Sequence, residues 1–387
     1  MLYSFPHPVG APGIGTIAEH QVRGLVGLGH EVTLYCTSLR AEIPGVRRTV
    51  ETLVVGRRRV PRRAVGVARA AAYHDWRVAR ELTTMAGEVD IVHCWGLAGV
   101  RTLRAAKAMG ARCMREVPNT HTGFAHERAS REAEAVGVRM PRRHSHSPNP
   151  RRLGLESAEF ALADDLLVPS DYVARTFLER GFPPDKLARH QYGFDPARFP
   201  APQRIGPSDG PLRAVFVGLG EPRKGLHHAL EAWLASGAAE TGTLVVCGRL
   251  LPAYQRRLAD RLAHPSVDVR GFASDVGAVM RSCHLLLLPS VEEGSALVTY
   301  EAQGSGCALV VSDATGALCR HGDHGLVHEA GDVEALTRDL ASLDRDRRLL
   351  RRMRERALAH RPELTWTKAS ERLEAIYRSR LSAPSRP

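Results

Sequence analysis

The sequence predicts an α/β protein with two doubly wound domains, each built on a parallel sheet that helices cover on both faces. Three observations support this fold class. Continuous Val/Leu-rich runs alternate with amphipathic stretches, the same alternation recurs in both halves of the chain, and a Pro/Gly-rich stretch over 194–213 separates the halves. Because ligands of open parallel sheets bind outside the carboxyl ends of the strands, we expect the two domains to face each other across a cleft that holds the chemistry.

The first half predicts a series of buried strands joined by helices. Only MLYSF precedes the first loop, which indicates either a very short first strand or a native start upstream of Met1, and we favour the second. Segment 124–152 interrupts the alternation: it begins as a helix and continues as a loop rich in Arg, His and Pro. This segment could be a lid, a contact for an anionic acceptor, a membrane-surface element or disordered chain. The expected strands cover 30–36, 52–55, 89–94, 111–117 and 165–169.

The second half repeats the pattern without such an interruption. Its Val/Leu runs are bounded by turns, and helical patterns lie between them, which is typical of strands that are buried on both faces. The expected strands cover 212–218, 242–248, 267–272, 284–290 and 307–313.

Composition favours a cytoplasmic protein with anionic partners. Seven cysteines without C-x-x-C spacing argue against a disulfide framework or a cysteine zinc site, and neither a membrane span nor a signal peptide is apparent. The net charge of +12 is concentrated in arginine clusters at 57–63, 139–144 and 345–356. We expect the third cluster to be a solvated helix face, and the segments 57–63 and 139–152 are candidates for peripheral contact with the inner face of a membrane. Nucleic acid is an unfavoured partner because aromatic residues make up only 5% and no recognition motif is present.

Two acidic residues eight positions apart mark the clearest candidate site. The stretch EEGSALVTYEA follows the buried run LLLLPS and contains Glu293 and Glu301. We expect a helix to begin near Ser295 with that residue as its N-cap, so that its first-turn amides attract a phosphate or sugar oxygen. Gly294 would let a ligand approach the backbone closely. Carboxylates bind vicinal hydroxyls, so a nucleotide-sugar along this helix would place its hexose near Glu293 and its ribose near Glu301.

A second motif, VFVGLGEPRKGLHHALEAW, reads as a strand, a tight loop and a helix. Arg223 and Lys224 lie where the helix begins, where a cation does not help the helix dipole. Neutralising a diphosphate is a better reason for these two charges. We expect His227 and His228, which follow, to be solvated or capping residues.

Together these motifs resemble the retaining GT-B glycosyltransferases of family 4, the glycosyl transferases of group 1. The resemblance covers nearly the whole chain and also rests on GHEVTLYC, DIVHCWG, PNTHTG, LADDLLVPSDYV, QYGFDPARF and LTWTKASERLEAIYR. It implies two Rossmann-like domains: an acceptor domain over 1–197 and, after a linker at 198–212, a nucleotide-sugar donor domain over 213–364. A final helix over 365–381 should cross back onto the first domain.

The resemblance also implies roles for individual residues. Lys224 and Arg223 should stabilise the departing diphosphate, and Glu293 and His121 should lie against the donor sugar. For His121 the alternative is a loop histidine that hydrogen-bonds only to backbone. Glu301 should bind the ribose. The remaining expected donor-binding positions are Gly15, Thr16, Gly218, Gly294, Ser295, Ala296 and Leu297.

The chemistry implied is transfer of a hexose from a nucleotide-diphosphate sugar to an acceptor hydroxyl, with retention of anomeric configuration. No convincing carboxylate nucleophile is visible in the first domain, so the resemblance implies a front-face displacement assisted by the leaving phosphate. The donor acts as a co-substrate, and we expect no cofactor and no metal. The D-x-D sequence formed by Asp344 and Asp346 lies in an arginine-rich helical region that is unlike a cation site.

Two departures from the family pattern keep other functions open. Many members carry an arginine where this chain has Leu219, and Thr16 replaces the second residue of the usual glycine pair. A catalytically weak or silent nucleotide-binding homologue is therefore one alternative. A basic protein that binds nucleic acid or an anionic surface is an alternative from a different class. An epimerase or phosphorylase of the same fold has no visible motif here.

Overall fold

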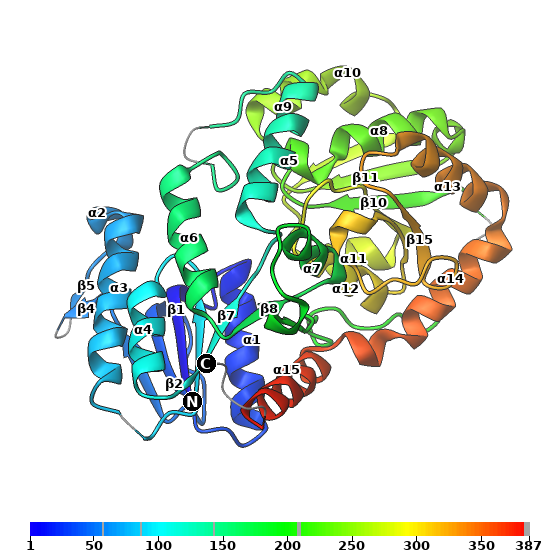
Figure 1. Cartoon of the computed structure of the whole chain (residues 1–387). Coiled ribbons are helices and arrows are strands. Elements are labelled where there is room, and N and C mark those ends of the chain that lie inside the picture. The colour runs from blue at the N-terminus through cyan, green and yellow to red at the C-terminus, as the bar shows by residue number, and fades with distance from the viewer. Residues whose placement is uncertain (56–57, 86, 142–143, 207–209, 383–387) are drawn as a thin grey trace. The chain divides into compact units, whose positions relative to one another are not determined.

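The computed structural model describes residues 1–55, 58–85, 87–141, 144–206 and 210–382 (Figure 1). The arginine clusters at 57–63 and 139–144 therefore lie partly outside the described residues. The chain forms two compact units. The first contains Met1–Pro118, Asn149–Gln191 and Trp366–Pro387, and the second contains Asn119–Pro148 and Tyr192–Thr365. Each unit is a doubly wound parallel sheet with helices, so the predicted fold class is confirmed.

The first unit contains a seven-stranded parallel sheet in the order β3-β2-β1-β6-β7-β8-β9. Strand β1, the third strand of this sheet, spans Leu2–Val9, so the alternative of a very short first strand limited to MLYSF was wrong. Its register with β2 shifts between Phe5 and Pro8, and such an irregularity accommodates prolines, which cannot donate to a ladder. The other strands are β2 (Thr33–Leu39), β3 (Arg48–Glu51), β6 (Ile91–Trp95), β7 (Arg112–Glu116), β8 (Asp165–Val168) and β9 (Leu187–Arg189). Strands β4 (Val54–Val55) and β5 (Arg58–Arg59) pair with each other in antiparallel fashion.

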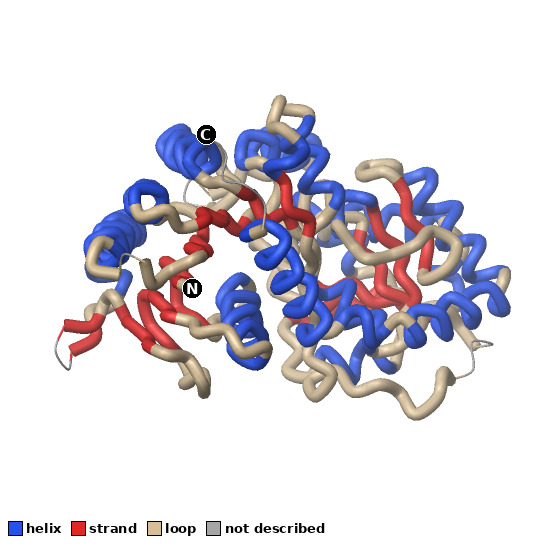
Figure 2. The backbone as a smooth tube through the Cα atoms, turned by 60° about the horizontal axis from the view of Figure 1, so that its bottom comes forward, coloured by secondary structure: helices blue, strands red, loops and turns tan. Residues whose placement is uncertain are grey.

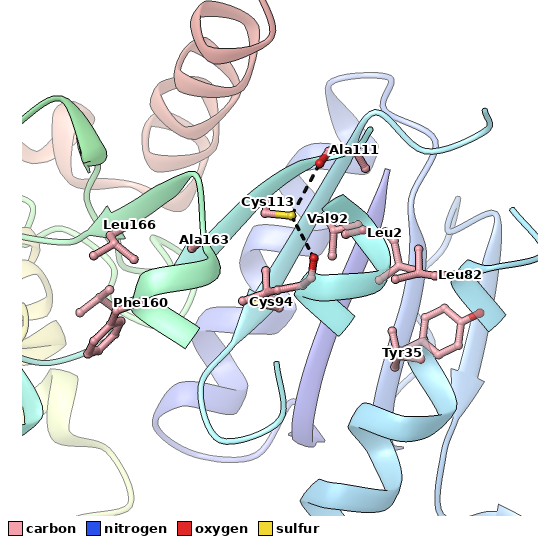
Figure 3. Close-up of a cluster of buried hydrophobic side chains, with 14 of the residues drawn as sticks. Leu2, Tyr35, Leu82, Val92, Cys94, Ala111, Cys113, Phe160, Ala163 and Leu166 are labelled. Carbon is pink, nitrogen blue, oxygen red and sulfur yellow. Dashed lines mark hydrogen bonds between the residues drawn. The ribbon is translucent and has the colours of Figure 1, made fainter. Parts of the chain in front are cut away.

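Helices cover this sheet and enclose its core. Helix α1 (Ile14–Gly27) packs against α15 (Trp366–Leu381), the last helix among the described residues, as Figure 1 shows. Figure 3 shows the core, in which Leu2, Val92 and Phe160 come from well-separated parts of the sequence. All seven cysteines are free thiols, six of them buried. The remaining helices are α2 (Arg62–Val65), α3 (Val67–Leu82), α4 (Val100–Ala108), α6 (Pro150–Leu162) and α7 (Asp171–Leu178).

The second unit contains a six-stranded parallel sheet in the order β12-β11-β10-β13-β14-β15, with helices along it (Figure 2). Helix α8 packs on α13, and α12 packs on α14. The strands are β10 (Arg213–Val217), β11 (Thr243–Cys247), β12 (Val267–Gly271), β13 (Leu285–Leu288), β14 (Ala308–Ser312) and β15 (Gly325–His328). The helices are α5 (Thr122–Ala135), α8 (Leu226–Ala235), α9 (Pro252–Arg257), α10 (Ala259–Leu262), α11 (Val276–Arg281), α12 (Leu297–Gly304), α13 (Val333–Arg345) and α14 (Arg347–Ala359).

The second unit also includes a segment that we had placed in the first domain. Residues Asn119–Pro148 leave the first sheet after β7, and α5 of this segment bonds to the second unit, where Arg128 donates to the carbonyl oxygen of Ala330 at 2.9 Å. The first unit is therefore not the continuous stretch 1–197. Within the described residues, no helix is both long and apolar enough to span a membrane.

Candidate functional site

The candidate site lies where the strand order of the second sheet reverses. Strand β10 is paired with both β11 and β13, so the chain winds outward in opposite directions from this point. The loops that follow β10 and β13 leave the sheet at the same edge because both strands are parallel. In doubly wound sheets this position forms the ligand-binding crevice. The loops contain the two motifs singled out above, residues 218–225 and 289–296.

The two loops are fixed to each other through their backbones. The Val291 N–H donates to the carbonyl oxygen of Arg223 at 2.9 Å. Gly225 adopts a left-handed conformation with φ of 70°, and a Cβ at this position would lie 2.0 Å from the carbonyl oxygen of Pro289. Only glycine meets both requirements, so it allows the loop after β10 to approach the loop after β13 this closely.

Arg223 lies at the centre of the charged network between the loops. Its side chain is 9% exposed and contacts three carboxylates. Nη2 lies 2.9 Å from Oε1 of Glu221, and Nη1 lies 3.2 Å from Oε2 of Glu292 and 3.1 Å from Oε2 of Glu293. Nη1 also donates to the backbone oxygen of Glu292 at 2.6 Å. The fixed fork of donors in a guanidinium suits this arrangement, which a lysine could not reproduce.

Lys224 pairs with Glu293 beside this network. Its ammonium donates to Oε1 of Glu293, which also accepts from the Ser290 hydroxyl at 3.4 Å. Burial, reinforced by the charge of Arg223, lowers the pKa of Lys224. An anion entering the site would meet the fixed charge of Arg223 and would favour the protonated, cationic form of Lys224. The structure brings together the predicted residues Arg223, Lys224 and Glu293.

Three further residues of this network were not predicted. Glu292 is fully buried and accepts from the Thr120 hydroxyl at 2.6 Å. Burial raises the pKa of Glu221, but the hydrogen bond from His144 and the charge of Arg223 outweigh it and lower the pKa to about 2. Nε2 of His144 lies 2.9 Å from Oε2 of Glu221. The adjacent pair of acids at 292 and 293 could have suggested Glu292, but no local signal connects residue 144 to residue 221.

Helix α12 begins one residue later than we expected. Its N-cap is Ala296, so the prediction of Ser295 as N-cap was wrong. The Ser295 hydroxyl instead lies 2.7 Å from the Tyr300 hydroxyl and donates to the carbonyl oxygen of Gly316 at 3.1 Å. The amide of Ala296 donates to the carbonyl oxygen of Thr315 at 2.9 Å, so this amide already has an acceptor. Leu297 is the first helical residue, and first-turn amides lack acceptors within a helix.

Glu301 is the fifth residue of α12. Burial raises the pKa of its carboxyl to about 7, although the charge of Arg198 acts in the opposite direction. A carboxyl with this pKa changes charge near neutrality, so a ligand that hydrogen-bonds to the carboxylate would favour its ionisation. Glu301 therefore differs from Glu293, which already has cationic partners.

His121 caps the start of α5 in the second unit. Its Nδ1 accepts a hydrogen bond from the Gly123 N–H at 3.2 Å. This bond assigns the proton of the neutral ring to Nε2. The neighbouring residue Thr120 bonds to Glu292, so the loop that carries His121 lies against the charged network.

The predicted donor-binding glycines Gly218 and Gly15 lie in different units. Gly218 follows β10, and its N–H donates to the carbonyl oxygen of Cys247 at 3.0 Å. Gly15 belongs to the first unit, where a Cβ would lie 2.5 Å from the carbonyl oxygen of Pro8, so glycine lets α1 approach β1. The Thr16 hydroxyl in the same unit donates to the carbonyl oxygen of Ala11 at 3.3 Å. Leu219, in the loop after β10, is 43% exposed.

His227 and His228 are not the solvated residues that we expected. His227 is buried and His228 is half-buried, and Nε2 of each approaches Glu132 of α5. The sequence could not reveal this contact because Glu132 lies in the segment that we had placed in the other domain.

Comparisons with known proteins assign the chain to a family. A model of Glycosyltransferase Family 4 matches residues 12–198, and a model of Glycosyl transferases group 1 matches residues 211–346. The putative colanic acid biosynthesis glycosyltransferase WcaL of Salmonella typhimurium is 29% identical over 199 residues, which cover 47% of this chain and 48% of the relative. A D-inositol 3-phosphate glycosyltransferase of Nocardia farcinica is 34% identical over 105 residues, covering 27% and 23%. The chain thus matches about half or less of the length of these relatives.

Solved structures show the same fold over almost the whole chain. Sucrose-phosphate synthase from Thermosynechococcus elongatus has a TM-score of 0.70 at 18% identity and covers 99% of both chains. Anabaena HepE in complex with UDP has a TM-score of 0.65 at 17% identity and covers 98% of this chain and 100% of that one. Since the two family models together span most of the sequence and the topology agrees, the chain belongs to the family 4, group 1 glycosyltransferases with the GT-B fold.

Proposed function

We propose that this protein transfers a hexosyl group from a nucleotide-diphosphate sugar to an acceptor hydroxyl, with retention of anomeric configuration. The observation that carries the proposal is the cluster of Arg223, Lys224 and Glu293 at the point where the second sheet reverses its strand order. Ligands bind at this position in doubly wound sheets. Structures of Anabaena HepE with UDP and with UDP-glucose share the fold and support a nucleotide-sugar donor.

In this proposal a diphosphate becomes the counter-ion of Lys224 and Arg223. Glu293, released from Lys224, accepts hydrogen bonds from the sugar hydroxyls, and His121 lies against the same sugar. Glu301 binds the ribose diol from the fifth position of α12. Amides at the start of α12 and the glycine at position 218 let the donor approach the backbone of the second unit.

The reaction needs no covalent enzyme intermediate. The bond between the anomeric carbon and the diphosphate oxygen breaks while the acceptor oxygen bonds to that carbon on the same face. The acceptor proton passes to the departing diphosphate. The protein contributes positioning and the fixed positive charges of Arg223 and Lys224, and the scheme requires no metal at the donor site.

A silent nucleotide-binding homologue is a second candidate because exposed Leu219 occupies a loop position where many family members carry arginine. This candidate binds the nucleotide but does not turn the donor over. A nucleic-acid or anionic-surface binding protein would instead lose affinity steeply with salt and would ignore free nucleotide.

A two-part experiment separates these candidates. The melting temperature is measured with UDP, GDP, ADP and dTDP for the wild type and for Glu301→Ala, because a ligand that binds the native state raises it. Transfer from the matching nucleotide-sugar is then followed by NMR of the anomeric proton. Two results together support the proposal: a nucleotide raises the melting temperature of the wild type more than that of Glu301→Ala, and an α-linked donor gives an α-linked product. No nucleotide response refutes it, binding without turnover favours the silent homologue, and an inverted product refutes retention.

A further inference from the structure

Helices α5 and α8 meet at a cluster of one carboxylate and two imidazoles. Nε2 of His227 lies 2.8 Å from Oε1 of Glu132, and Nε2 of His228 lies 3.2 Å from the same oxygen. The three ligand-type atoms all lie within 4.8 Å of one another. All three residues belong to the second unit, and the proposed glycosyl transfer uses none of them.

The convergence of the two histidines is not a consequence of helix geometry alone. Consecutive helix residues point about 100° apart, so neighbouring side chains do not ordinarily meet at one atom. Here both rings turn toward Glu132, and their centroids lie 3.9 Å apart. The cluster therefore depends on the approach of α5 to the first turn of α8.

A neighbouring tyrosine orients the first of these rings. Nδ1 of His227 lies 2.6 Å from the Tyr254 hydroxyl, which also accepts from the His227 backbone N–H at 2.9 Å. With Nδ1 engaged in this way, Nε2 faces Glu132. Metal-bound histidines show the same arrangement, in which a hydrogen bond to the second ring nitrogen fixes the ring.

One cationic side chain of α5, that of Arg128, interacts with the Glu132 carboxylate. Arg128 opposes cation binding, although its own guanidinium donates to the carbonyl oxygen of Ala330.

We propose that Oε1 of Glu132 and Nε2 of His227 and His228 bind a divalent transition-metal ion, for which zinc is the best fit. Two histidines and one glutamate are an established zinc donor set, with water in the fourth position. Tetrahedral bonds of about 2.0–2.1 Å require ligand atoms roughly 3.3 Å apart. The contact of His228, 3.2 Å, is close to this spacing, and that of His227, 2.8 Å, must open by about half an ångström.

The ion would link two elements that carry candidate site residues. Helix α5 begins at the His121 cap, and α8 follows Arg223 and Lys224 directly. A bond between the helices would hold these loops at a fixed separation within the second unit. This inference departs from our expectation that the chain holds no metal, although the ion lies outside the donor-binding residues.

A second cluster in the same unit is a weaker candidate. Ligand-type atoms of His144, His146 and Glu221 also lie within 4.8 Å of one another. However, the Arg223 guanidinium lies 2.9 Å from the Glu221 carboxylate and would repel a cation directly. This cluster supplies a matched control for the proposed site.

The test is metal binding by full-length protein after dialysis against EDTA. Zn²⁺ is titrated calorimetrically, and Co²⁺ is titrated by visible absorption, which distinguishes tetrahedral from octahedral coordination. We expect one tight site in the wild type, at least tenfold weaker binding in Glu132→Gln and His228→Ala, and unchanged binding in His144→Ala. Circular dichroism checks that each variant is folded, and Glu132→Gln preserves side-chain size should His228→Ala unfold.

The outcomes bear on the metal site independently of nucleotide binding. No stoichiometric Zn²⁺ or Co²⁺ site in the wild type overturns the proposal. Loss of binding in His144→Ala alone also overturns it, because the ion then belongs to the second cluster. Since no nucleotide is present, failure of the proposed glycosyl transfer would leave this result unchanged.

Discussion

The hydroxyl of Tyr377 in α15 lies 2.5 Å from Nδ1 of His93 in β6, and both residues are buried. Nε2 of His93 lies 3.2 Å from the buried carboxylate of Glu116, which also accepts from Gln21 of α1. The last helix thus completes a polar network inside the first unit, where each buried polar group would be costly without a partner.

Tyr377→Phe should lower the free energy of unfolding by about 1–3 kcal/mol because it removes the hydrogen bond and leaves buried Nδ1 of His93 without that partner. Urea denaturation followed by circular dichroism measures this change. Tyr73→Phe is the control, since Tyr73 is 39% exposed, and it should change stability little. Equal effects of the two substitutions would show that the buried bond contributes nothing specific.

Gly225→Ala should destabilise the protein far more than Gly237→Ala. Both glycines have positive φ, 70° and 82°, so alanine costs about 1–2 kcal/mol of backbone strain at either position. Only at Gly225 would the new Cβ also meet a backbone oxygen, that of Pro289 at 2.0 Å, whereas nothing lies within 4 Å at Gly237. Thermal denaturation of the two variants compares the strain with and without the clash, and similar melting temperatures would contradict the close approach of the loops.

Arg223→Met should lower the free energy of unfolding by about 3–5 kcal/mol, because removal of one partner leaves buried carboxylates uncompensated. Arg223→Lys should recover only part of this loss, since an ammonium cannot contact Glu221, Glu292 and Glu293 together. Denaturant titration of both variants is the measurement. Full recovery by lysine would mean that charge alone, and not the fork of donors, holds the network.

Lys224→Ala should reduce kcat for glycosyl transfer about 10²–10³-fold if this ammonium stabilises the departing diphosphate. Its effect on KM should be smaller, because the charge on the leaving oxygen develops in the transition state. Steady-state kinetics with the nucleotide-sugar identified by the binding screen measures both constants. Lys107→Ala, in the first unit, is the control and should leave them unchanged; an unchanged kcat in Lys224→Ala would remove Lys224 from the mechanism.

The contribution of Glu301 to nucleotide affinity should rise with pH and level off near pH 7. Because burial raises the pKa of Glu301 to about 7, the folded protein keeps a proton there that the unfolded chain loses above about pH 4.5. Glu301 therefore reduces stability as pH rises between these values. A ribose that hydrogen-bonds to the carboxylate favours its ionisation, so Kd should increase up to about tenfold for each pH unit below 7.

Calorimetric titration between pH 5.5 and 8.5 tests this dependence. Glu301→Gln keeps the size of the side chain but cannot ionise. Ionisation of the nucleotide phosphate affects the Kd of both proteins equally, so it cancels in the ratio of the two Kd values. The pH dependence of this ratio therefore reports the ionisation of Glu301 alone. A ratio that does not vary with pH would exclude Glu301 as the titrating group.

Much of the fold could be predicted because buried parallel strands leave a strong local signal. The runs around Leu244, Leu286 and Val310 are continuous and apolar, and each became a strand of the second sheet. Strand β9 was missed because Leu187–Arg189 is short and not continuously apolar. Strand β15 was missed for a similar reason: Gly325–His328 has only three apolar or small residues before a histidine.

The site was predictable only where its chemistry is local in sequence. Arg223, Lys224 and Glu293 stand in two short motifs at the ends of strands, so strand positions alone brought them together. His144, His227 and Glu132 could not be placed, because their contacts depend on which unit holds the segment Asn119–Pro148. The contacts of α5 with the rest of the second unit, such as that of Arg128 with Ala330, leave no periodicity in the sequence.

The division of the chain into units also constrains how the protein is made. The chain passes from one unit to the other after Pro118, Pro148, Gln191 and Thr365, so neither unit is a continuous stretch of sequence. A ribosome synthesises the chain from its N-terminus. The buried polar network of the first unit therefore lacks the Tyr377 hydroxyl until that residue has emerged. Chains arrested before α15 should therefore expose the His93 network to water, and nascent molecules would depend on protection until α15 has emerged.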